Sequence, residues 1–320
     1  MTVCQLYAKQ IRHRGNVRYN TKNGRKRLMK LLEEDKLGGC PIDSVKLSDA
    51  KEWAIRMKEK GISYKTISND KRSLKAAFYT AIQDDCIRKN PFDFQLNTVI
   101  EDDTEPKVPL TPAQEESFLS FAQNDKVYQK YYDELIILLG TGLRISELCG
   151  LTDTDINFEN RIINVDHQLL RSAETGYYIE TPKTKSGIRQ IPMSEKVYEA
   201  FNRVLKRRRG AKAVTIDGYS NFLFLNRDGY PKTATNYDGM FRGLAKKYNK
   251  YHEEALPKVM TPHTLRHTFC TNMANAGMNP KALQYIMGHS NITMTLNYYA
   301  HATFCLLYTS PSPRDPKTSR

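Results

Sequence analysis

The sequence has 320 residues, a mean hydropathy of −0.60 and 40% hydrophobic residues, which is typical of a soluble protein of about two domains. Its longest apolar run, "LIILLG", is far shorter than the about 20 residues needed to span a bilayer. The N-terminus "MTVCQLYAKQ" lacks the apolar core of a signal peptide. These features argue against a membrane partner and predict a cytoplasmic location.

The charge of the chain points to a polyanionic partner. The chain has 49 Lys and Arg against 35 Asp and Glu, a net charge of +14, and such an excess favours nucleic acid. Residues 1–96 contain 21 basic and 11 acidic residues, so the excess is concentrated there. The six cysteines form no CxxC pair, which argues against a disulfide framework or a zinc ribbon and predicts reduced thiols.

Residues 1–100 have the pattern of a small all-helical domain. One helix is expected over 48–61, with Ser48 as its N-cap, and a second over 63–85. The second helix collects its apolar residues on one face: Ile67, Leu74, Ala77, Phe78, Ala81 and Ile82. Its basic residues lie toward other faces and are expected to contact phosphates: Lys65, Lys71, Arg72 and Lys75.

The stretch 97–110 is acidic, contains two prolines and lacks periodicity, so residues 101–110 are interpreted as a linker. A new helix is expected directly after it, because Thr111 suits the N-cap position and Pro112 the first helical position.

The rest of the chain mixes helices with a strand-rich segment. Helices are expected over 111–123, 128–151, 194–208, 235–251, 262–277 and 279–288. Strands are expected over 161–170, 176–183 and 188–193, with "TKSG" as a turn. This pattern predicts an α+β domain, mainly α with a small antiparallel β-sheet. Residues 305–320 lose all periodicity and are expected to be a disordered or non-native tail.

The segment "MTPHTLRHTF" carries the first candidate chemistry. Thr261 and Pro262 predict a helix N-terminus, which places His263 and Arg266 in the first turn. A helix N-terminus favours anions, so these side chains suit a phosphate that gains or loses a bond. His263 and His267 have metal-binding spacing, but HExxH is absent and no third ligand is evident. No metal is predicted, and His267 is expected to be structural.

Two further segments contribute candidate cations. Arg144 follows a Gly-Thr-Gly break, where a tight turn would project it into a cleft; an ion pair with Glu147 is the alternative. "TPKTKSGIRQIP" places Lys183 at a strand end and Lys185 in the turn, from which a lysine can protonate a leaving oxygen. A basic hairpin facing solvent or DNA backbone is the alternative for these lysines.

In order along the chain, "TGLRISEL", "PKTKSG", "RQIP", "HTLRHTF" and "MGHSNITMTLNYYAH" resemble the motifs of the tyrosine recombinase (phage-type integrase) family. The resemblance covers roughly residues 3–304 and is greatest to integrases of conjugative transposons. It implies a helical core-DNA-binding (SAM-like) domain at 1–100 and a catalytic domain at 111–304. In this family the two domains form a C-shaped clamp around duplex DNA.

The resemblance also implies roles for individual residues. The implied catalytic residues are Arg144, Lys183, His263, Arg266, His289 and Tyr299. Tyr299, ten residues past His289, is the expected nucleophile, and Tyr298 is expected to pack. Tyr299 would form a phosphotyrosyl bond to the DNA 3′ end. The leaving 5′ oxygen would take a proton from Lys183 or Lys185 and become a free 5′-hydroxyl. Because this bond retains the energy of the ester, no ATP, metal or other cofactor is expected.

The implied activity is site-specific recombination that integrates or excises a mobile element. Its partners would be double-stranded attachment sites, three further copies of the chain in a homo-tetramer, and an excisionase or host bending protein. A type IB topoisomerase and a non-catalytic DNA-binding regulator remain as alternatives. Transposon integrases commonly carry an additional N-terminal arm-binding domain, and little sequence precedes the core-binding region here, which puts binding to arm sites in question. Because 305–320 replaces the usual C-terminal segment, we expect a complete active site with impaired subunit coupling.

Overall fold

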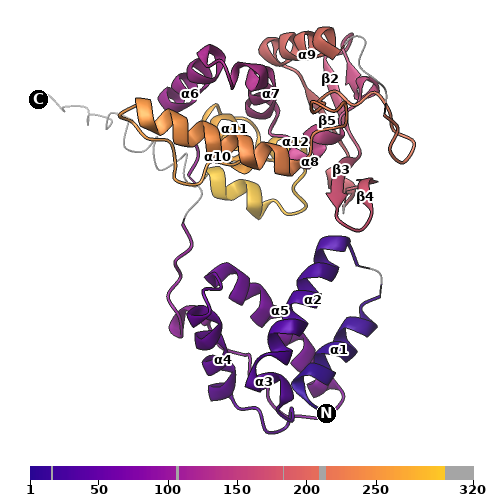
Figure 1. The fold of residues 1–320 in the computed structure, drawn as a ribbon, viewed down its shortest axis with the longest axis vertical. Helices are drawn as coiled ribbons and strands as arrows, with labels where there is room; N and C mark the ends of the chain where they lie inside the picture. Colours follow the sequence, from indigo (N-terminus) through magenta and orange to yellow (C-terminus); the bar gives the residue numbers. More distant parts are fainter. Residues whose placement is uncertain (16, 106–107, 183, 209–213, 300–320) are drawn as a thin grey trace, which may run out of the picture. The chain divides into compact units, whose positions relative to one another are not determined.

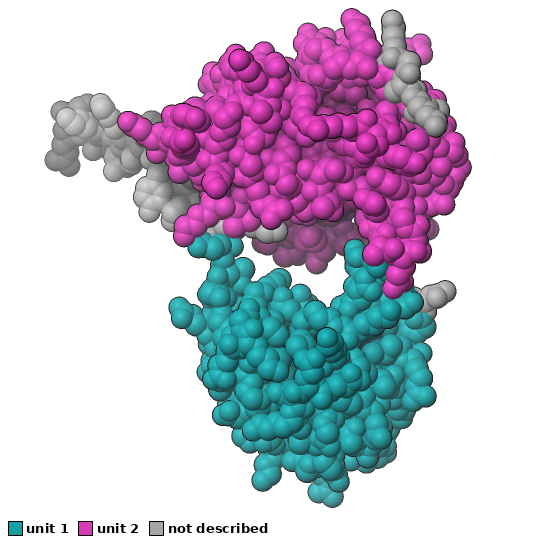
Figure 2. Space-filling model, viewed as in Figure 1, with its two compact units in different colours: residues 1–106 teal, residues 107–320 magenta. Residues whose placement is uncertain are grey.

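The computed structural model describes residues 1–320 except 16, 106–107, 183, 209–213 and 300–320. The chain divides into two compact units, residues 1–106 (unit 1) and 107–320 (unit 2), which Figure 2 shows in different colours. Each unit has its own hydrophobic core. Among the described helices, none combines the length and apolar character needed to cross a membrane.

Unit 1 is helical (Figure 1). Its helices are α1 (Val3–His13), α2 (Tyr19–Glu33), α3 (Lys36–Gly39), α4 (Leu47–Glu59), α5 (Tyr64–Gln83) and the 3₁₀ helix η1 (Leu96–Thr98). The core centres on Trp53, Phe78 and Phe92, with the Trp53 and Phe92 rings 5.8 Å apart edge to face. Five of the six residues expected on the apolar face of 63–85 are buried there, and Ile82 is half-buried.

The start of α4 differs from the prediction. The helix begins at Leu47 with Lys46 as its N-cap residue, so Ser48 lies inside the first turn. The Asp49 carboxylate accepts a hydrogen bond from the Lys46 amide at 2.8 Å. Asp49, the third residue of the helix, therefore satisfies the amide of the N-cap residue Lys46, and a carboxylate there also complements the helix dipole.

The labelled α-helices of unit 2 run from α6 to α12 (Figure 1). They are α6 (Pro112–Asn124), α7 (Tyr132–Thr141), α8 (Ile145–Gly150), α9 (Glu195–Arg208), α10 (Ala234–Tyr251), α11 (Pro262–Asn275) and α12 (Pro280–Met287). Residues 293–299 are also helical. The predicted cap of α6 is confirmed, because the Thr111 hydroxyl accepts from the Gln114 amide at 3.1 Å.

The helix expected over 128–151 is broken where the Gly-Thr-Gly turn was recognised. Gly142 ends α7 in the left-handed region, with φ of 63°. A Cβ at this position would lie 2.5 Å from Cδ1 of Phe269, which packs against it from α11. The break therefore needs glycine for both conformation and space, and it redirects the chain so that Arg144 precedes α8.

The strands form two small antiparallel sheets, which confirms a mainly α fold with a minor antiparallel β component. They are β1 (Ile156–Asn157), β2 (Ile162–Val165), β3 (Gln168–Ser172), β4 (Gly176–Glu180) and β5 (Arg189–Pro192). One sheet has the order β1-β2-β5, with Ile163 opposite Ile191. The other is the hairpin β3-β4, with Leu170 opposite Tyr178.

The expected hairpin around "TKSG" is wrong. β4 pairs with β3 and β5 pairs with β2, so residues 181–188 link two sheets rather than two paired strands. Burial explains this pairing, because Arg189 and Ile191 alternate inward on β5 and align with the inward residues of β2. The 3₁₀ helix η4 (Lys185–Gly187) lies within this link.

Candidate active site

Arg144 is placed by the turn that separates α7 from α8. Its Nη1 lies 2.7 Å from Oε1 of Glu147, and its Nη2 donates to the Gly288 carbonyl at 3.0 Å. The side chain is 34% exposed, so part of the guanidinium faces solvent. The structure thus combines the two expectations for Arg144, an ion pair with Glu147 and projection into a cleft. The ion pair holds the guanidinium in place, and the guanidinium can still bind a ligand.

Arg266 lies in the first turn of α11, as predicted, but it is buried. Its guanidinium donates to the carbonyls of Gly142 and Met287, at the ends of α7 and α12. Burial lowers its pKa to about 9, with a further lowering by the charge of Arg144 and an opposing effect of Glu147. Arg266 therefore remains a cation at neutral pH.

A buried ion pair between Arg189 and Glu147 lies next to Arg144 and Arg266. Arg189 on β5 donates to Glu147 from Nη1 at 3.0 Å and from Nη2 at 2.7 Å. Burial by itself would raise the pKa of Glu147, but Arg189, Arg144 and Arg266 lower it to about 2. The carboxylate is therefore fixed as an anion amid three guanidiniums. Sequence reasoning missed Arg189, whose only signal was an arginine at an inward position of a strand.

His289 joins the arginines through the end of α12. Arg266 contacts the carbonyl of Met287, Arg144 contacts that of Gly288, and His289 follows directly. Its Nδ1 lies 3.0 Å from the Thr295 hydroxyl. Burial lowers the His289 pKa to about 4, together with Arg266 and Arg144, so the imidazole is neutral near pH 7. A neutral ring with one nitrogen engaged can donate from the other to a phosphate oxygen.

His263 has a different environment from Arg266, although the two lie in one turn. His263 is exposed, whereas Arg266 is buried. The backbone of residues 287–289 therefore joins three candidate residues, the partly exposed Arg144 and the buried Arg266 and His289, whereas His263 lies at the exposed start of α11.

The two adjacent tyrosines point to different partners. The Tyr298 hydroxyl lies 2.5 Å from Nδ1 of His267, whereas the Tyr299 hydroxyl donates to the carbonyl of Met278. Burial and Cys270 raise the pKa of Tyr298 to about 12, against a lowering by the charge of Arg266. Burial and Cys270 also raise the pKa of Tyr299. Arg266 therefore acts electrostatically on Tyr298, the residue that was expected to pack.

Of the two candidate lysines, Lys183 lies outside the described residues, and Lys185 is exposed at the start of η4. The segment that carries both ends at Arg189, whose Nη1 also donates to the Gly187 carbonyl at 3.0 Å. Arg189 therefore ties the base of the lysine segment to the Glu147 carboxylate.

The basic residues of α5 fall into two pairs. Lys65 and Arg72 are exposed and lie seven residues apart, on one face of the helix. Lys71 donates to the Phe94 carbonyl at 2.5 Å, and Lys75 lies 2.5 Å from the Asp93 carboxylate. The second pair therefore has partners inside unit 1, which leaves Lys65 and Arg72 better placed to meet a phosphate.

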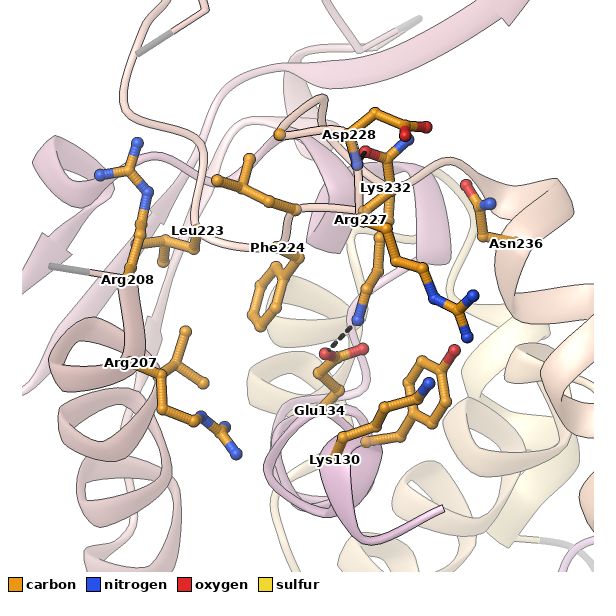
Figure 3. Close-up of a pocket in the computed structure, with 15 residues that line it drawn as sticks. Lys130, Glu134, Arg207, Arg208, Leu223, Phe224, Arg227, Asp228, Lys232 and Asn236 are labelled. Atoms are coloured by element: carbon orange, nitrogen blue, oxygen red, sulfur yellow. Dashed lines mark hydrogen bonds and ion pairs between the residues drawn. The ribbon is translucent and has the colours of Figure 1, made fainter. Parts of the chain in front are cut away.

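A second basic region of unit 2 was not recognised in the sequence. It is a pocket of about 810 Å³, called here the basic pocket. Its cationic lining is Lys130, Arg207, Arg208, Arg227 and Lys232. Figure 3 shows Arg207 and Arg208 on one side, and Lys232 paired with Glu134 on the other at 2.5 Å. These cations come from segments spread over about a third of the chain, so no local pattern reveals them.

Comparison with known proteins identifies the family. Residues 109–305 match the model of the phage integrase family. The chain is 69% identical over 304 residues to the transposase from transposon Tn916 of Enterococcus faecalis, an alignment that covers 95% of this chain and 75% of that protein. It is 27% identical over 292 residues, 84% of this chain and 71% of the relative, to a XerC-like tyrosine recombinase of Caldanaerobacter subterraneus.

Solved structures agree with these relatives. The chain resembles the Tn1549 transposon integrase in complex with a circular intermediate DNA, with a TM-score of 0.92, 74% identity and coverage of 96% and 99% of the two chains. That integrase carries an arginine-to-lysine substitution. Another Tn1549 integrase structure, with a tyrosine-to-phenylalanine substitution and bound to transposon right end DNA, has a TM-score of 0.91 at 77% identity, with coverage of 96% and 98%. The chain therefore belongs to the phage integrase family and is a tyrosine recombinase, an enzyme that breaks and rejoins DNA strands at specific sites.

Proposed function

We propose that this recombinase integrates and excises a mobile element of the conjugative-transposon class through a 3′-phosphotyrosyl intermediate. The observation that carries the proposal is the cluster of the partly exposed Arg144 and the buried Arg266 and His289, which presents two guanidiniums and a neutral imidazole around consecutive backbone carbonyls. The similarity to transposon enzymes from Enterococcus and to DNA-bound Tn1549 integrase supports the choice of substrate.

In this proposal Arg144 and Arg266 bind the non-bridging oxygens of the scissile phosphate. Their charges stabilise the negative charge that grows in the pentacoordinate transition state. His289 donates a hydrogen bond to a phosphate oxygen. Glu147 and Arg189 do not touch the substrate; they hold Arg144 in position through a buried carboxylate.

We assign the nucleophile to Tyr298 in preference to Tyr299, the residue expected from the sequence. The charge of Arg266 lowers the pKa of Tyr298, and the hydroxyl of Tyr299 donates to the backbone carbonyl of Met278. The Tn1549 comparison supports the same choice. The arginine and the tyrosine substituted in those integrases are separated by the same number of residues as Arg144 and Tyr298. Tyr299 is one residue too far along the chain.

The leaving 5′ oxygen needs a proton, and we assign its donor to Lys183, with Lys185 as the alternative. Both residues belong to the segment 181–188, which Arg189 anchors at its C-terminal end. His263, exposed at the start of α11, assists proton transfer in this scheme.

Contacts with DNA outside the scissile phosphate are assigned to exposed cations of both units. In unit 1, the proposed core-binding domain, these are Lys65 and Arg72 on α5. In unit 2 they are Lys185 and the basic pocket, in which Lys130 and Arg227 are exposed. We further propose that four copies assemble on paired sites and that an excisionase or host bending protein sets the direction of the reaction.

The test is covalent trapping on a nicked suicide duplex that carries the transposon right end bound by the Tn1549 integrase. Wild-type protein is expected to form a covalent protein–DNA complex, with the modified peptide mapping to Tyr298. Tyr298→Phe should lose the complex while still binding the duplex, and Tyr299→Phe should retain it. The reverse pattern would restore Tyr299 as the nucleophile, and a wild-type protein that binds without any covalent complex would contradict an enzymatic role.

Paired sites on one supercoiled plasmid separate recombination from relaxation. Exchange between the sites is expected, and it requires both sites. Relaxation of a plasmid without exchange would instead support a type IB topoisomerase, which uses similar phosphotyrosyl chemistry.

A further inference from the structure

The Tyr298 hydroxyl is hydrogen bonded to a histidine that the preceding scheme leaves without a role. Nδ1 of His267 lies 2.5 Å from Oη of Tyr298, and the two ring centroids are 5.4 Å apart at an angle of 40°. His267 follows Arg266 on α11, so the turn that presents the buried guanidinium also presents this imidazole. The contact joins residues 31 positions apart, so tertiary packing rather than chain neighbourhood makes it.

The surroundings of Tyr298 keep its phenol protonated. Burial and Cys270 raise its pKa to about 12, against the lowering by Arg266. Among the described residues, the ionisable groups that act on the pair include Arg266 and Cys270 on α11 and His289 beyond α12. A protonated phenol is a poor nucleophile, so attack on a phosphate requires a base that removes the proton as the bond to phosphorus forms.

His267 has the geometry for this task. A neutral imidazole with its hydrogen on Nε2 has a lone pair at Nδ1, the nitrogen nearest to the hydroxyl. An imidazole has an ordinary pKa of about 6.5, which suits proton exchange near neutral pH. The corresponding nitrogen of His289 is engaged by Thr295, so His289 is already committed to another partner through Nδ1.

We propose that His267 is a catalytic residue that accepts the proton of Tyr298 during cleavage, an inference that rests on Tyr298 as the nucleophile. The bond between Tyr298 Oη and phosphorus forms, the bond between phosphorus and the 5′ oxygen breaks, and the Tyr298 proton moves to His267 Nδ1. The 5′ oxygen takes its proton from the lysine general acid. In rejoining, the 5′-hydroxyl attacks phosphorus, its proton returns to the lysine, and His267 gives its proton back to the leaving Tyr298.

The first experiment compares single-turnover cleavage of the suicide duplex by wild type, His267→Asn and His267→Phe. Both variants are expected to cleave about 10²–10⁴-fold more slowly, the usual contribution of a general base, with unchanged DNA affinity. The pH profile of single-turnover cleavage should differ between wild type and His267→Asn, because only the wild type contains the proton-accepting imidazole. His252→Gln, a histidine substitution at the C-cap of α10 that removes stacking on Tyr248, is the matched control.

Two chemical substitutions separate proton acceptance from a structural role. A fluorinated tyrosine incorporated at position 298 lowers the phenol pKa and should restore most of the rate of His267→Phe while changing wild type little. A 5′-bridging phosphorothiolate substrate needs no protonation of its leaving group. It should rescue a variant of the lysine general acid but leave His267→Phe slow.

The outcomes distinguish this inference from the function on which it rests. If Tyr298→Phe abolishes the covalent complex but His267→Asn cleaves at the wild-type rate with an unchanged pH profile, the role of His267 is overturned and the nucleophile stands. Absence of rescue by fluorotyrosine, with folding and DNA binding intact, would also overturn it. If Tyr298→Phe still forms the complex, the assignment of the nucleophile itself fails.

Discussion

Arg189 and Glu147 form a doubly hydrogen-bonded ion pair whose side chains are 0% and 3% exposed. The pair joins β5 to α8, and the same carboxylate holds Arg144 at 2.7 Å. Arg189 also donates from Nε to the Ile286 carbonyl at 2.6 Å. One buried charge pair thus links the segment of the candidate lysines, the proposed catalytic residue Arg144 and the helix before His289.

Arg189→Met is expected to damage both stability and cleavage. Removing one partner of a buried ion pair leaves the other charge uncompensated, which costs about 3–5 kcal/mol. Arg161→Met is the matched control, because Arg161 pairs with Glu195 at 2.5 Å while both side chains are about half exposed. That surface pair should contribute about 0–1 kcal/mol. Urea denaturation measures the difference, and equal losses in the two variants would contradict the role assigned to Arg189.

Glu147 predicts a specific dependence of stability on pH. Its pKa falls from 4.5 to about 2 in the folded protein. A carboxylate with a lowered pKa stabilises the fold above its unfolded pKa, and this contribution disappears as pH falls through the folded pKa. The difference in unfolding free energy between wild type and Glu147→Gln should therefore shrink by about 3 kcal/mol between pH 5 and pH 2. A difference that stays constant over this range would show that Glu147 is not held as an anion.

The exposed cations of α5 should govern affinity rather than chemistry. Lys65→Gln and Arg72→Gln are each expected to weaken DNA binding and to reduce the slope of log affinity against log salt by about 1. Lys75→Gln serves as the control, because Lys75 is already paired with Asp93. Fluorescence anisotropy across a salt series provides the measurement. A larger effect at Lys75 than at Lys65 would place the DNA on another face of α5.

Gly142 is expected to be far less tolerant than Gly61, although both have positive φ. In Gly61→Ala the new Cβ meets nothing within 4 Å, so only the strain of the left-handed conformation remains, about 1–2 kcal/mol. In Gly142→Ala the Cβ also collides with Phe269, and the carbonyl that accepts from Arg266 must move. Thermal unfolding and the rate of covalent complex formation should both suffer more in Gly142→Ala. Similar melting temperatures in the two variants would contradict this account.

Local patterns predicted the parts of the fold that local chemistry determines. Thr111 and Pro112 mark the start of α6 because capping depends on a few adjacent residues. Gly142 marks the break after α7 for the same reason. The N-cap predicted at Ser48 is wrong because α4 begins at Leu47, where Asp49 accepts from the amide of the N-cap residue Lys46. Ser and Asp both favour helix starts, so their pattern alone does not fix the exact first residue.

Contacts between distant segments could not be predicted in this way. The pairing of β5 with β2 instead of β4 follows from which residues are buried, and Arg189 meets Glu147 across 42 positions. The choice between Tyr298 and Tyr299 is similar, because adjacent residues of one helix point in different directions. Only the packing of that helix against α11 and the loop at Met278 assigns their partners.

Arg266 holds together two helix ends as well as binding its proposed phosphate. Its guanidinium donates hydrogen bonds to backbone carbonyls at the C-termini of α7 and α12, where a cation is favoured and an unpaired carbonyl is costly. Truncating this side chain to inactivate the protein would therefore also destabilise the helix ends that surround the candidate active site. For capturing an uncleaved DNA complex in its native geometry, removal of a single tyrosine hydroxyl is the safer way to silence the enzyme.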